Sequence, residues 1–132
     1  MDAHAENCIV VASGANANLL PSDLAKSEEA IEKADLILMQ LEIPMDTVEF
    51  VAKMASKKNK RVILNPAPAQ TLSATLLRHL YMITPNETEA EMISGVKITD
   101  EVSAKKAATS YNGDGSTERN RYFRLKRSFD LL

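Results

Sequence analysis

The chain reads Ile83-Thr84-Pro85-Asn86-Glu87-Thr88-Glu89-Ala90-Glu91 where a short apolar run gives way to a polar, helix-forming stretch. An Asn with a Glu three positions later matches a helix N-terminal capping box in all but the identity of its first residue. In α/β proteins, ligands bind in the crevice at the carboxyl ends of the strands, where such a junction lies. We therefore expect an α/β fold with its functional edge here.

Four short apolar runs lie along the chain and do not alternate with polar residues: 8–12, 36–39, 62–64 and 80–83. Continuous runs of this length are typical of strands that are buried on both faces. Apolar side chains recur at helical spacing between these runs, in residues 21–34 and 45–58. The order strand, helix, strand, helix, strand predicts a parallel sheet with right-handed crossovers.

Three further helices are expected towards the carboxyl end of the chain. Residues 70–79 carry three leucines at helical spacing, and a helix that begins near Asn86 should stop at Gly95, a residue that commonly ends helices. Another helix is expected over residues 99–110. Residues 1–110 therefore form one α/β unit in our interpretation.

Length, charge and cysteine content limit the classes of protein to which this chain can belong. With 132 residues, of which 45% are hydrophobic and 26% charged, the chain has an ordinary globular balance. Sixteen basic and 18 acidic residues leave a net charge of −2, with no basic face in residues 1–110 for nucleic acid. No apolar stretch approaches the roughly 20 residues of a membrane span. The lone Cys8 and the absence of a signal-peptide pattern at the N-terminus favour a cytoplasmic location, without nucleic-acid or membrane partners.

Three stretches, taken together, resemble the ribokinases, which belong to the PfkB-type family of carbohydrate kinases. They are Leu38-Met39-Gln40-Leu41-Glu42-Ile43-Pro44, Leu64-Asn65-Pro66-Ala67-Pro68-Ala69 and the Asn86-x-x-Glu89 junction. The resemblance implies part of a Rossmann-like, three-layer α/β fold with a mostly parallel sheet. For a complete family member it also implies transfer of the ATP γ-phosphate to the 5-hydroxyl of D-ribose or a similar pentose. Mg²⁺ and a monovalent cation such as K⁺ are the implied cofactors.

Glu42 follows one apolar run and precedes Pro44, so it should project from the carboxyl end of a strand into the ligand crevice. A carboxylate there can accept hydrogen bonds from two sugar hydroxyls. From the residues alone, a solvated loop carboxylate near a helix start is the favoured interpretation. The resemblance implies that Glu42 contacts the sugar.

Asn86 and Glu89 have a purely structural interpretation as a capping box. The resemblance implies in addition that Asn86 contacts ATP and that Glu89 acts on magnesium through water. The two interpretations are compatible, because the free N–H groups of a helix N-terminus favour anions. Magnesium keeps several of its waters, so Glu89 alone would not make a metal site.

The resemblance covers about residues 6–108 and corresponds to the middle of a family member. It implies that a complete member also has an N-terminal strand, a Gly-rich sugar-binding segment with a small lid, and a Gly-Ala-Gly-Asp motif that supplies the catalytic base. The chain has a Gly-Asp-Gly at residues 113–115, but without strand or helix context, so we assign no catalytic residue. We expect no useful kinase activity from the chain alone, and exposed sheet edges that favour self-association.

The tail, residues 111–132, differs from the rest because it combines turn-forming residues with a cluster of Arg and Lys. One interpretation is a flexible basic terminus; the other is that the chain has left its ancestral reading frame. Codons for residues 112–130, read one base further on, can encode a turn, a buried strand and a Thr-Leu-Gly-x-x-Gly loop. The nucleotide sequence of the gene tests this hypothesis directly. We do not expect the tail to supply the next strand of the sheet.

A second functional class remains open. The chain could be a noncatalytic α/β binding or interaction module in which the acidic residues only cap helices and residues 119–127 contact a partner. Weak sugar or nucleotide binding through Glu42 or Asn86 would favour the kinase interpretation. Partner binding that depends on the basic tail would favour the module.

Overall fold

The computed structural model of the chain describes residues 14–111 and 122–125. The strand expected at residues 8–12 lies outside this part. The helical elements, with 3-10 helices labelled η, are η1 (Gly14–Asn18), η2 (Pro21–Ser27), α1 (Glu28–Lys33), α2 (Met45–Lys57), α3 (Ala74–His79), α4 (Glu87–Ser94) and α5 (Glu101–Tyr111). The strands are β1 (Leu36–Met39), β2 (Arg61–Leu64), β3 (Met82–Ile83) and β4 (Tyr122–Phe123).

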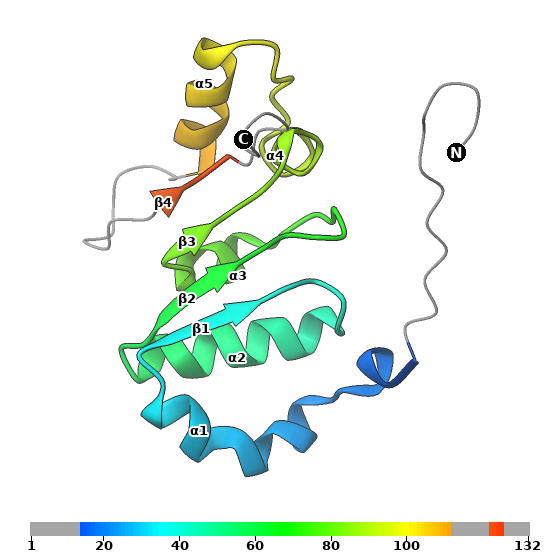
Figure 1. The fold of residues 1–132 in the computed structure, drawn as a ribbon, viewed down its shortest axis with the longest axis vertical. Helices are drawn as coiled ribbons and strands as arrows, with labels where there is room; N and C mark the ends of the chain where they lie inside the picture. The colour runs from blue at the N-terminus through cyan, green and yellow to red at the C-terminus, as the bar shows by residue number, and fades with distance from the viewer. Residues whose placement is uncertain (1–13, 112–121, 126–132) are drawn as a thin grey trace, which may run out of the picture.

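The four strands form one sheet in the order β1-β2-β3-β4, and every neighbouring pair is parallel. The expected α/β fold with a parallel sheet is confirmed. Each crossover advances one strand in the same direction, so right-handed connections place all the intervening helices on one face. Figure 1 shows α2 and α3 behind the strands. The described residues thus form the sheet and one helical layer.

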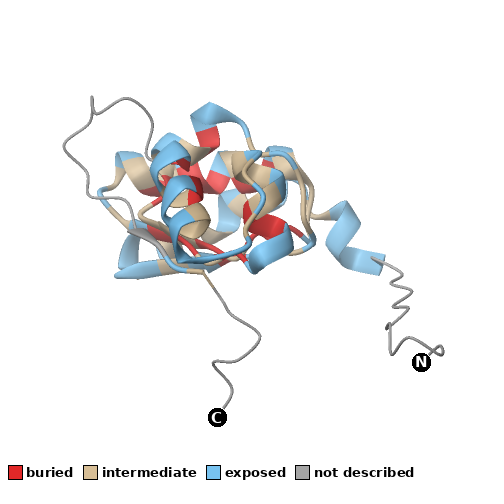
Figure 2. Ribbon diagram, turned by 90° about the horizontal axis from the view of Figure 1, so that it is seen from above, coloured by how far each residue is buried: buried red, intermediate tan, exposed pale blue. Residues whose placement is uncertain are grey.

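The hydrophobic core lies between the sheet and α2. The predicted stripe of Val48, Val51 and Ala55 is buried on the inner side of this helix. It packs in one cluster with Val62 and Leu64 of β2, which are fully buried. Figure 2 shows the buried residues concentrated between the helices and the strands. This core fixes the central strands and, through them, the loops at their carboxyl ends.

Several element boundaries differ from the prediction. The segment expected as one helix over residues 21–34 begins as the 3-10 helix η2 and becomes α-helical only at Glu28. Residues 70–73 precede α3, because the Ser73 hydroxyl caps this helix by accepting the N–H of Leu76 at 3.0 Å. The strand expected at residues 80–83 is limited to Met82–Ile83. The sequence pattern located these elements, and the cap by Ser73 set the start of α3.

The tail contributes a strand, contrary to our expectation. Ile83 is in register with Phe123, and the N–H of Arg124 donates to the carbonyl of Ile83 at 3.0 Å. Two residues in a crowded basic segment carry little periodicity, so their pairing with β3 is a tertiary feature that the sequence did not indicate.

Candidate functional site

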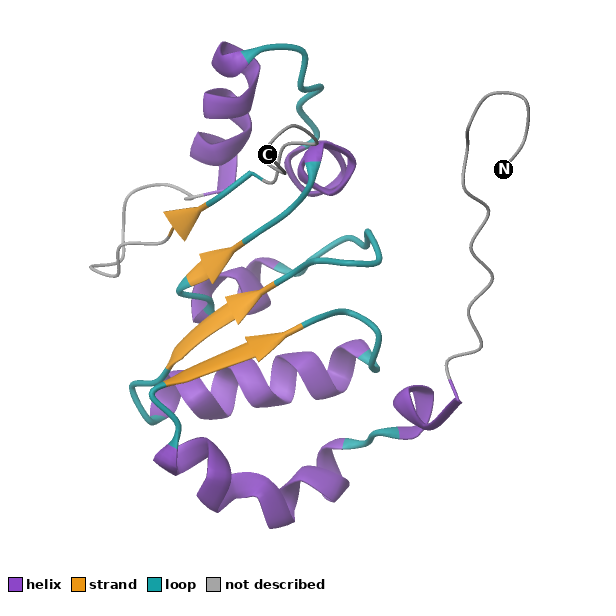
Figure 3. Cartoon of the chain, in the orientation of Figure 1, coloured by secondary structure: helices purple, strands orange, loops and turns teal. Residues whose placement is uncertain are grey.

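The carboxyl ends of all four strands lie along one edge of the sheet, because the strands are parallel. The loops that leave this edge lead into α2, α3 and α4 (Figure 3). Ligands of open α/β sheets bind outside this edge. The predicted residues Glu42, Asn86 and Glu89 all follow strands there.

Glu42 lies in the bend between β1 and α2, and its neighbour Leu41 anchors that bend. The Leu41 side chain is buried, its N–H donates to the carbonyl of Ala67 at 2.9 Å, and its carbonyl accepts the Gln70 Nε2 at 3.2 Å. Glu42 is exposed and has no hydrogen-bond partner among the described residues. An exposed carboxylate, on a loop whose backbone is held by these hydrogen bonds, can accept hydrogen bonds from a ligand with hydroxyl groups.

The loop after β2 is held as a scaffold beside that bend. The Asn65 N–H donates to the carbonyl of Met39 at 2.9 Å, and Pro66 is fully buried. The peptide bond between Ala67 and Pro68 is cis. This loop shapes the edge next to Glu42 through its backbone.

The segment that precedes η2 is also tied to this edge. Thr47, in the first turn of α2, is fully buried, and its hydroxyl donates to the carbonyl of Leu19 at 2.7 Å. This bond fixes the chain just after η1 against the start of α2. The Gly-Ala-Asn-Ala stretch of η1 is exposed.

Asn86 and Glu89 form a complete capping box at the start of α4. The Asn86 Oδ1 accepts the Glu89 N–H at 2.8 Å, and the Glu89 Oε2 accepts the Asn86 N–H at 2.8 Å. Glu89 is 6% exposed, whereas Asn86 is exposed. The structural interpretation of this pair is therefore correct. The second carboxylate oxygen of Glu89 and the Asn86 amide nitrogen take no part in these two bonds.

The donor set around Glu89 does not fit a magnesium cage. Among the described residues, no three His, Cys, Asp or Glu side chains converge to hold a metal ion. One oxygen of Glu89 is already used by the cap. The arrangement fits an indirect role, in which ligand phosphates and water would complete the coordination.

Glu42 and the capping pair share an edge but belong to separate loops. Strand β2 lies between β1 and β3, so the two strand ends are about 10 Å apart. A ligand that meets both would have to extend across the end of β2. The two loops therefore suit different parts of one ligand, or two ligands side by side.

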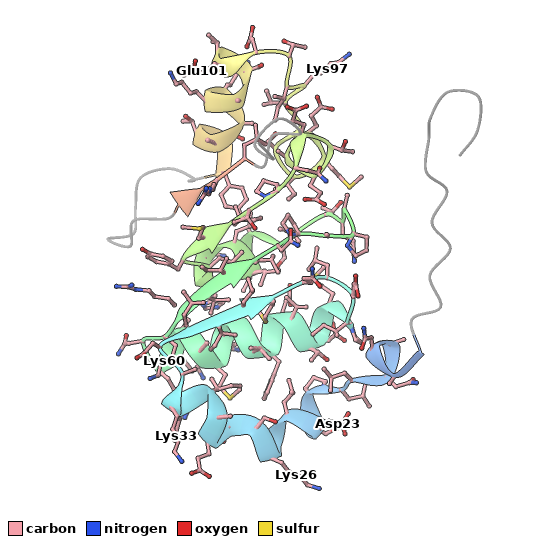
Figure 4. All side chains as sticks on the ribbon, in the orientation of Figure 1. Asp23, Lys26, Lys33, Lys60, Lys97 and Glu101 are labelled. Atoms are coloured by element: carbon pink, nitrogen blue, oxygen red, sulfur yellow. The ribbon has the colours of Figure 1, made fainter. Side chains whose placement is uncertain are left out.

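The structure also forms a pocket that the sequence did not indicate. It has a volume of about 230 Å³ and is lined by Glu87, Asp100, Glu101, Ile98, Thr99, Ala104 and Leu125. Hydrogen bonds from the backbone N–H and hydroxyl of Ser103 hold the pKa of Asp100 below its usual value. Only the pairing of β4 with β3 brings residue 125 to α4 and α5, so spacing along the chain gave no signal. Figure 4 labels Glu101 at this end of the molecule.

Comparison with known proteins decides the family. The profile of pfkB family carbohydrate kinases matches residues 1–119. The chain belongs to this family. It is 51% identical over 110 residues to the ribokinase of Haemophilus influenzae, which covers 83% of the chain.

Solved ribokinases agree with this pfkB-family assignment. The structure of Arabidopsis thaliana ribokinase complexed with ribose and ATP is 25% identical, has a TM-score of 0.71 and covers 92% of this chain. The Thermotoga maritima ribokinase is 30% identical, has a TM-score of 0.70 and covers 96%. The expected ribokinase-like fold is confirmed.

The match extends over a limited part of each relative. The chain spans 36% of the length of the H. influenzae protein, 38% of the Arabidopsis chain and 39% of the Thermotoga chain. More than half of each relative therefore lies outside the matched segment. None of the helices in the described part of the chain is long and apolar enough to cross a bilayer.

Proposed function

We propose that the chain supplies peripheral ligand contacts of an ATP-dependent ribokinase site. Glu42 binds hydroxyl groups of D-ribose or a similar pentose, and Asn86 contacts ATP. Glu89 acts on Mg²⁺ through water. A monovalent cation such as K⁺ is a cofactor of the complete family enzyme in this proposal.

One observation carries the proposal. Glu42 and the Asn86–Glu89 pair follow the carboxyl ends of parallel strands, in a chain that is 51% identical to a ribokinase over 110 residues. The exposed carboxylate of Glu42 suits a neutral polyol, since it has no competing partner among the described residues. The N-terminus of α4 suits an anion, because its first N–H groups point towards the ligand edge.

The same residues explain why turnover should require more than this chain. Phosphoryl transfer depends on a positioned acceptor, a base and preplaced donors that stabilise charge on the moving phosphoryl group. Magnesium, when bound, would neutralise phosphate charge. Glu42, Asn86 and Glu89 hold ligands at the rim, and none of them is placed to take the proton of the sugar hydroxyl in this proposal. We infer binding without useful turnover by the chain alone.

The test combines an activity assay with a binding measurement. The purified, folded chain is incubated with D-ribose, ATP, magnesium and potassium, and ribose binding is measured by calorimetry. We expect no turnover, and a loss of ribose affinity of about tenfold or more in Glu42→Ala, because hydrogen bonds to a charged group are removed. Glu29→Ala, an exposed carboxylate on α1, is the matched control and should leave ribose binding unchanged.

Two results would contradict the proposal. Ribose phosphorylation by the chain, lost in Glu42→Ala, would show that the absent motif is dispensable. Equal ribose affinity in the original chain and in Glu42→Ala would remove the assigned role of Glu42. Binding of a protein partner that depends on the basic tail, without sugar or nucleotide binding, would favour the noncatalytic module.

A further inference from the structure

The bend that carries Glu42 has few restraints of its own. No hydrogen bond joins the backbone of Glu42 or Ile43 to another described residue. After them, the Pro44 carbonyl accepts two N–H groups from the first turn of α2. Before them, Leu41 is the last residue whose backbone is hydrogen-bonded. The position of the Glu42 carboxylate therefore depends on how firmly Leu41 is held.

Leu41 is held by the loop that follows β2. Its N–H donates to the Ala67 carbonyl at 2.9 Å, and its carbonyl accepts the Gln70 Nε2 at 3.2 Å. Leu41 is 3% exposed, so without Gln70 its carbonyl would be buried and unsatisfied, which costs free energy. Among the described residues, Gln70 supplies the only side chain that hydrogen-bonds to Leu41.

The amide of Gln70 suits this task. A carbonyl can only accept, so the amide nitrogen must face Leu41. The Gln70 side chain is half-buried, and a hydrogen bond away from water is electrostatically stronger than one in water. The bond joins two loops that are 29 positions apart in the sequence. The N–H donor, rather than the bulk of the side chain, is therefore the feature that ties the loops together.

The segment that carries Gln70 is itself anchored on both sides. Before it, Pro66 is fully buried. After it, the Ser73 hydroxyl donates to the Glu49 carboxylate of α2 at 2.6 Å and also caps α3. A functional side chain is held precisely when its supporting residues are themselves fixed by packing and hydrogen bonds. The loop of residues 66–73 therefore gives Gln70 a fixed base.

We propose that Gln70 is a positioning residue for ribose binding, which acts through Leu41 to direct Glu42 towards the sugar. Hydrogen bonds weaken steeply as their geometry departs from the optimum, so a small displacement of the Glu42 carboxylate lowers its affinity for hydroxyl groups. Gln70 itself does not touch the sugar in this assignment. The inference rests on the function proposed above and extends it to a residue that supports the ligand contact.

The first measurement follows the bend without a ligand, by amide hydrogen exchange on the full 132-residue chain. In Gln70→Met the Leu41 N–H should exchange about threefold faster or more, because one of the two bonds that hold this residue is lost. The Thr84 N–H, which donates to the Leu64 carbonyl at 3.0 Å, is the reference and should be unchanged. Gln70→Arg keeps an N–H donor and should restore slow exchange. Thr71→Met, at the adjacent exposed position, is the matched control.

The second measurement is the affinity for D-ribose, from an NMR titration that also reports weak binding. We expect Gln70→Met to weaken ribose binding by about threefold or more, and Gln70→Arg to restore it. In the Glu42→Ala background, Gln70→Met should change the affinity by less than about twofold, because a residue that acts through Glu42 then has nothing to position. A general loss of stability would act in both backgrounds.

Four results would overturn the proposal. Equal Leu41 exchange in the original chain and in Gln70→Met would show that Gln70 does not hold the bend. Similar acceleration at Leu41 and Thr84 would indicate global destabilisation. Faster Leu41 exchange with unchanged ribose affinity would leave a purely structural contact. An equal loss of affinity with and without Glu42 would make Gln70 a direct sugar contact.

Failure of the proposed function gives a different result. If the original chain does not bind ribose, the function proposed for Glu42 is contradicted. The exchange measurement needs no ribose, so it still decides by itself whether Gln70 holds the bend.

Discussion

At the scale of single residues, Asn86 and Glu89 combine a structural task with a proposed ligand task. Their reciprocal hydrogen bonds satisfy two N–H groups at the start of α4. The buried position of Glu89 follows from that geometry, since its carboxylate folds back over the helix start. Substitutions can separate the two tasks, because capping depends on the acceptor atom and ligand binding depends on the whole side chain.

We predict that Asn86→Ala lowers the free energy of unfolding by about 1 kcal/mol, while Asn86→Ser retains most of the stability because serine also caps well. Glu89→Gln should likewise preserve the capping box. Urea denaturation of the three variants measures the differences. Nucleotide binding should weaken in Asn86→Ser despite its stability. Equal stability of Asn86→Ala and the original chain would argue against the cap.

At the scale of elements, a group of ion pairs fastens α1 to the end of α2. The Lys58 ammonium lies 3.0 Å from the Glu28 carboxylate and also pairs closely with Glu32. The hydrogen bond and the charge of Lys58 hold the pKa of Glu32 below its usual value. The hydrogen bonds to Glu32 and Glu28 raise the pKa of Lys58. This contact positions the segment that leads into β1.

We predict that Lys58→Met destabilises the chain at neutral pH. The difference in stability between the variant and the original chain should shrink at both low and high pH. Because the pKa of Glu32 is lower in the folded chain than in the unfolded chain, its ion pair contributes stability at pH values above the unfolded pKa. This contribution is lost as the pH falls through the lowered, folded pKa. A raised Lys58 pKa contributes stability that is lost as the pH rises through the raised pKa. Thermal unfolding across the pH range measures the effect, and high salt should reduce it. A pH-independent difference would point to lost packing of the lysine stem instead.

At the scale of the whole molecule, the two faces of the sheet differ in what they contact. Leu64 is fully buried under α2, whereas Leu38, on the adjacent strand, is largely exposed. The same residue type therefore makes very different contributions to stability. The contrast follows from strand order and crossover handedness, which place α2 and α3 behind the strands (Figure 1).

We predict that Leu64→Ala lowers the free energy of unfolding by about 2–5 kcal/mol, because it leaves a cavity in the core. Leu38→Ala should cost about 0.5 kcal/mol or less in the isolated chain, as is usual for exposed sites. Chemical denaturation of both variants gives the comparison. Similar losses in the two variants would show that the outer face is already covered in the isolated chain.

The residues at the strand ends show how far sequence reasoning reaches. The Asn86-x-x-Glu89 spacing predicted both the helix start and its cap, because capping acts between residues three apart. The apolar runs predicted β1 and β2, and the stripe on α2 predicted the core. The exact start of α3 was missed, since Ser73 caps it while Gln70 bonds to the Leu41 carbonyl across the edge. The pocket beside Glu87 was missed because it needs residue 125.

The sequence by itself indicated the family, the parallel α/β pattern and the residues that follow the carboxyl ends of the strands. These features depend on local spacing and on motifs that are contiguous along the chain. Only the tertiary structure decided that Tyr122–Phe123 pairs with β3. It also decided that hydrogen bonds of Leu41 hold the bend that carries Glu42, and that Leu36 and Leu38 are exposed. Each of those depends on contacts between distant segments, and a one-dimensional pattern does not specify which distant surfaces meet.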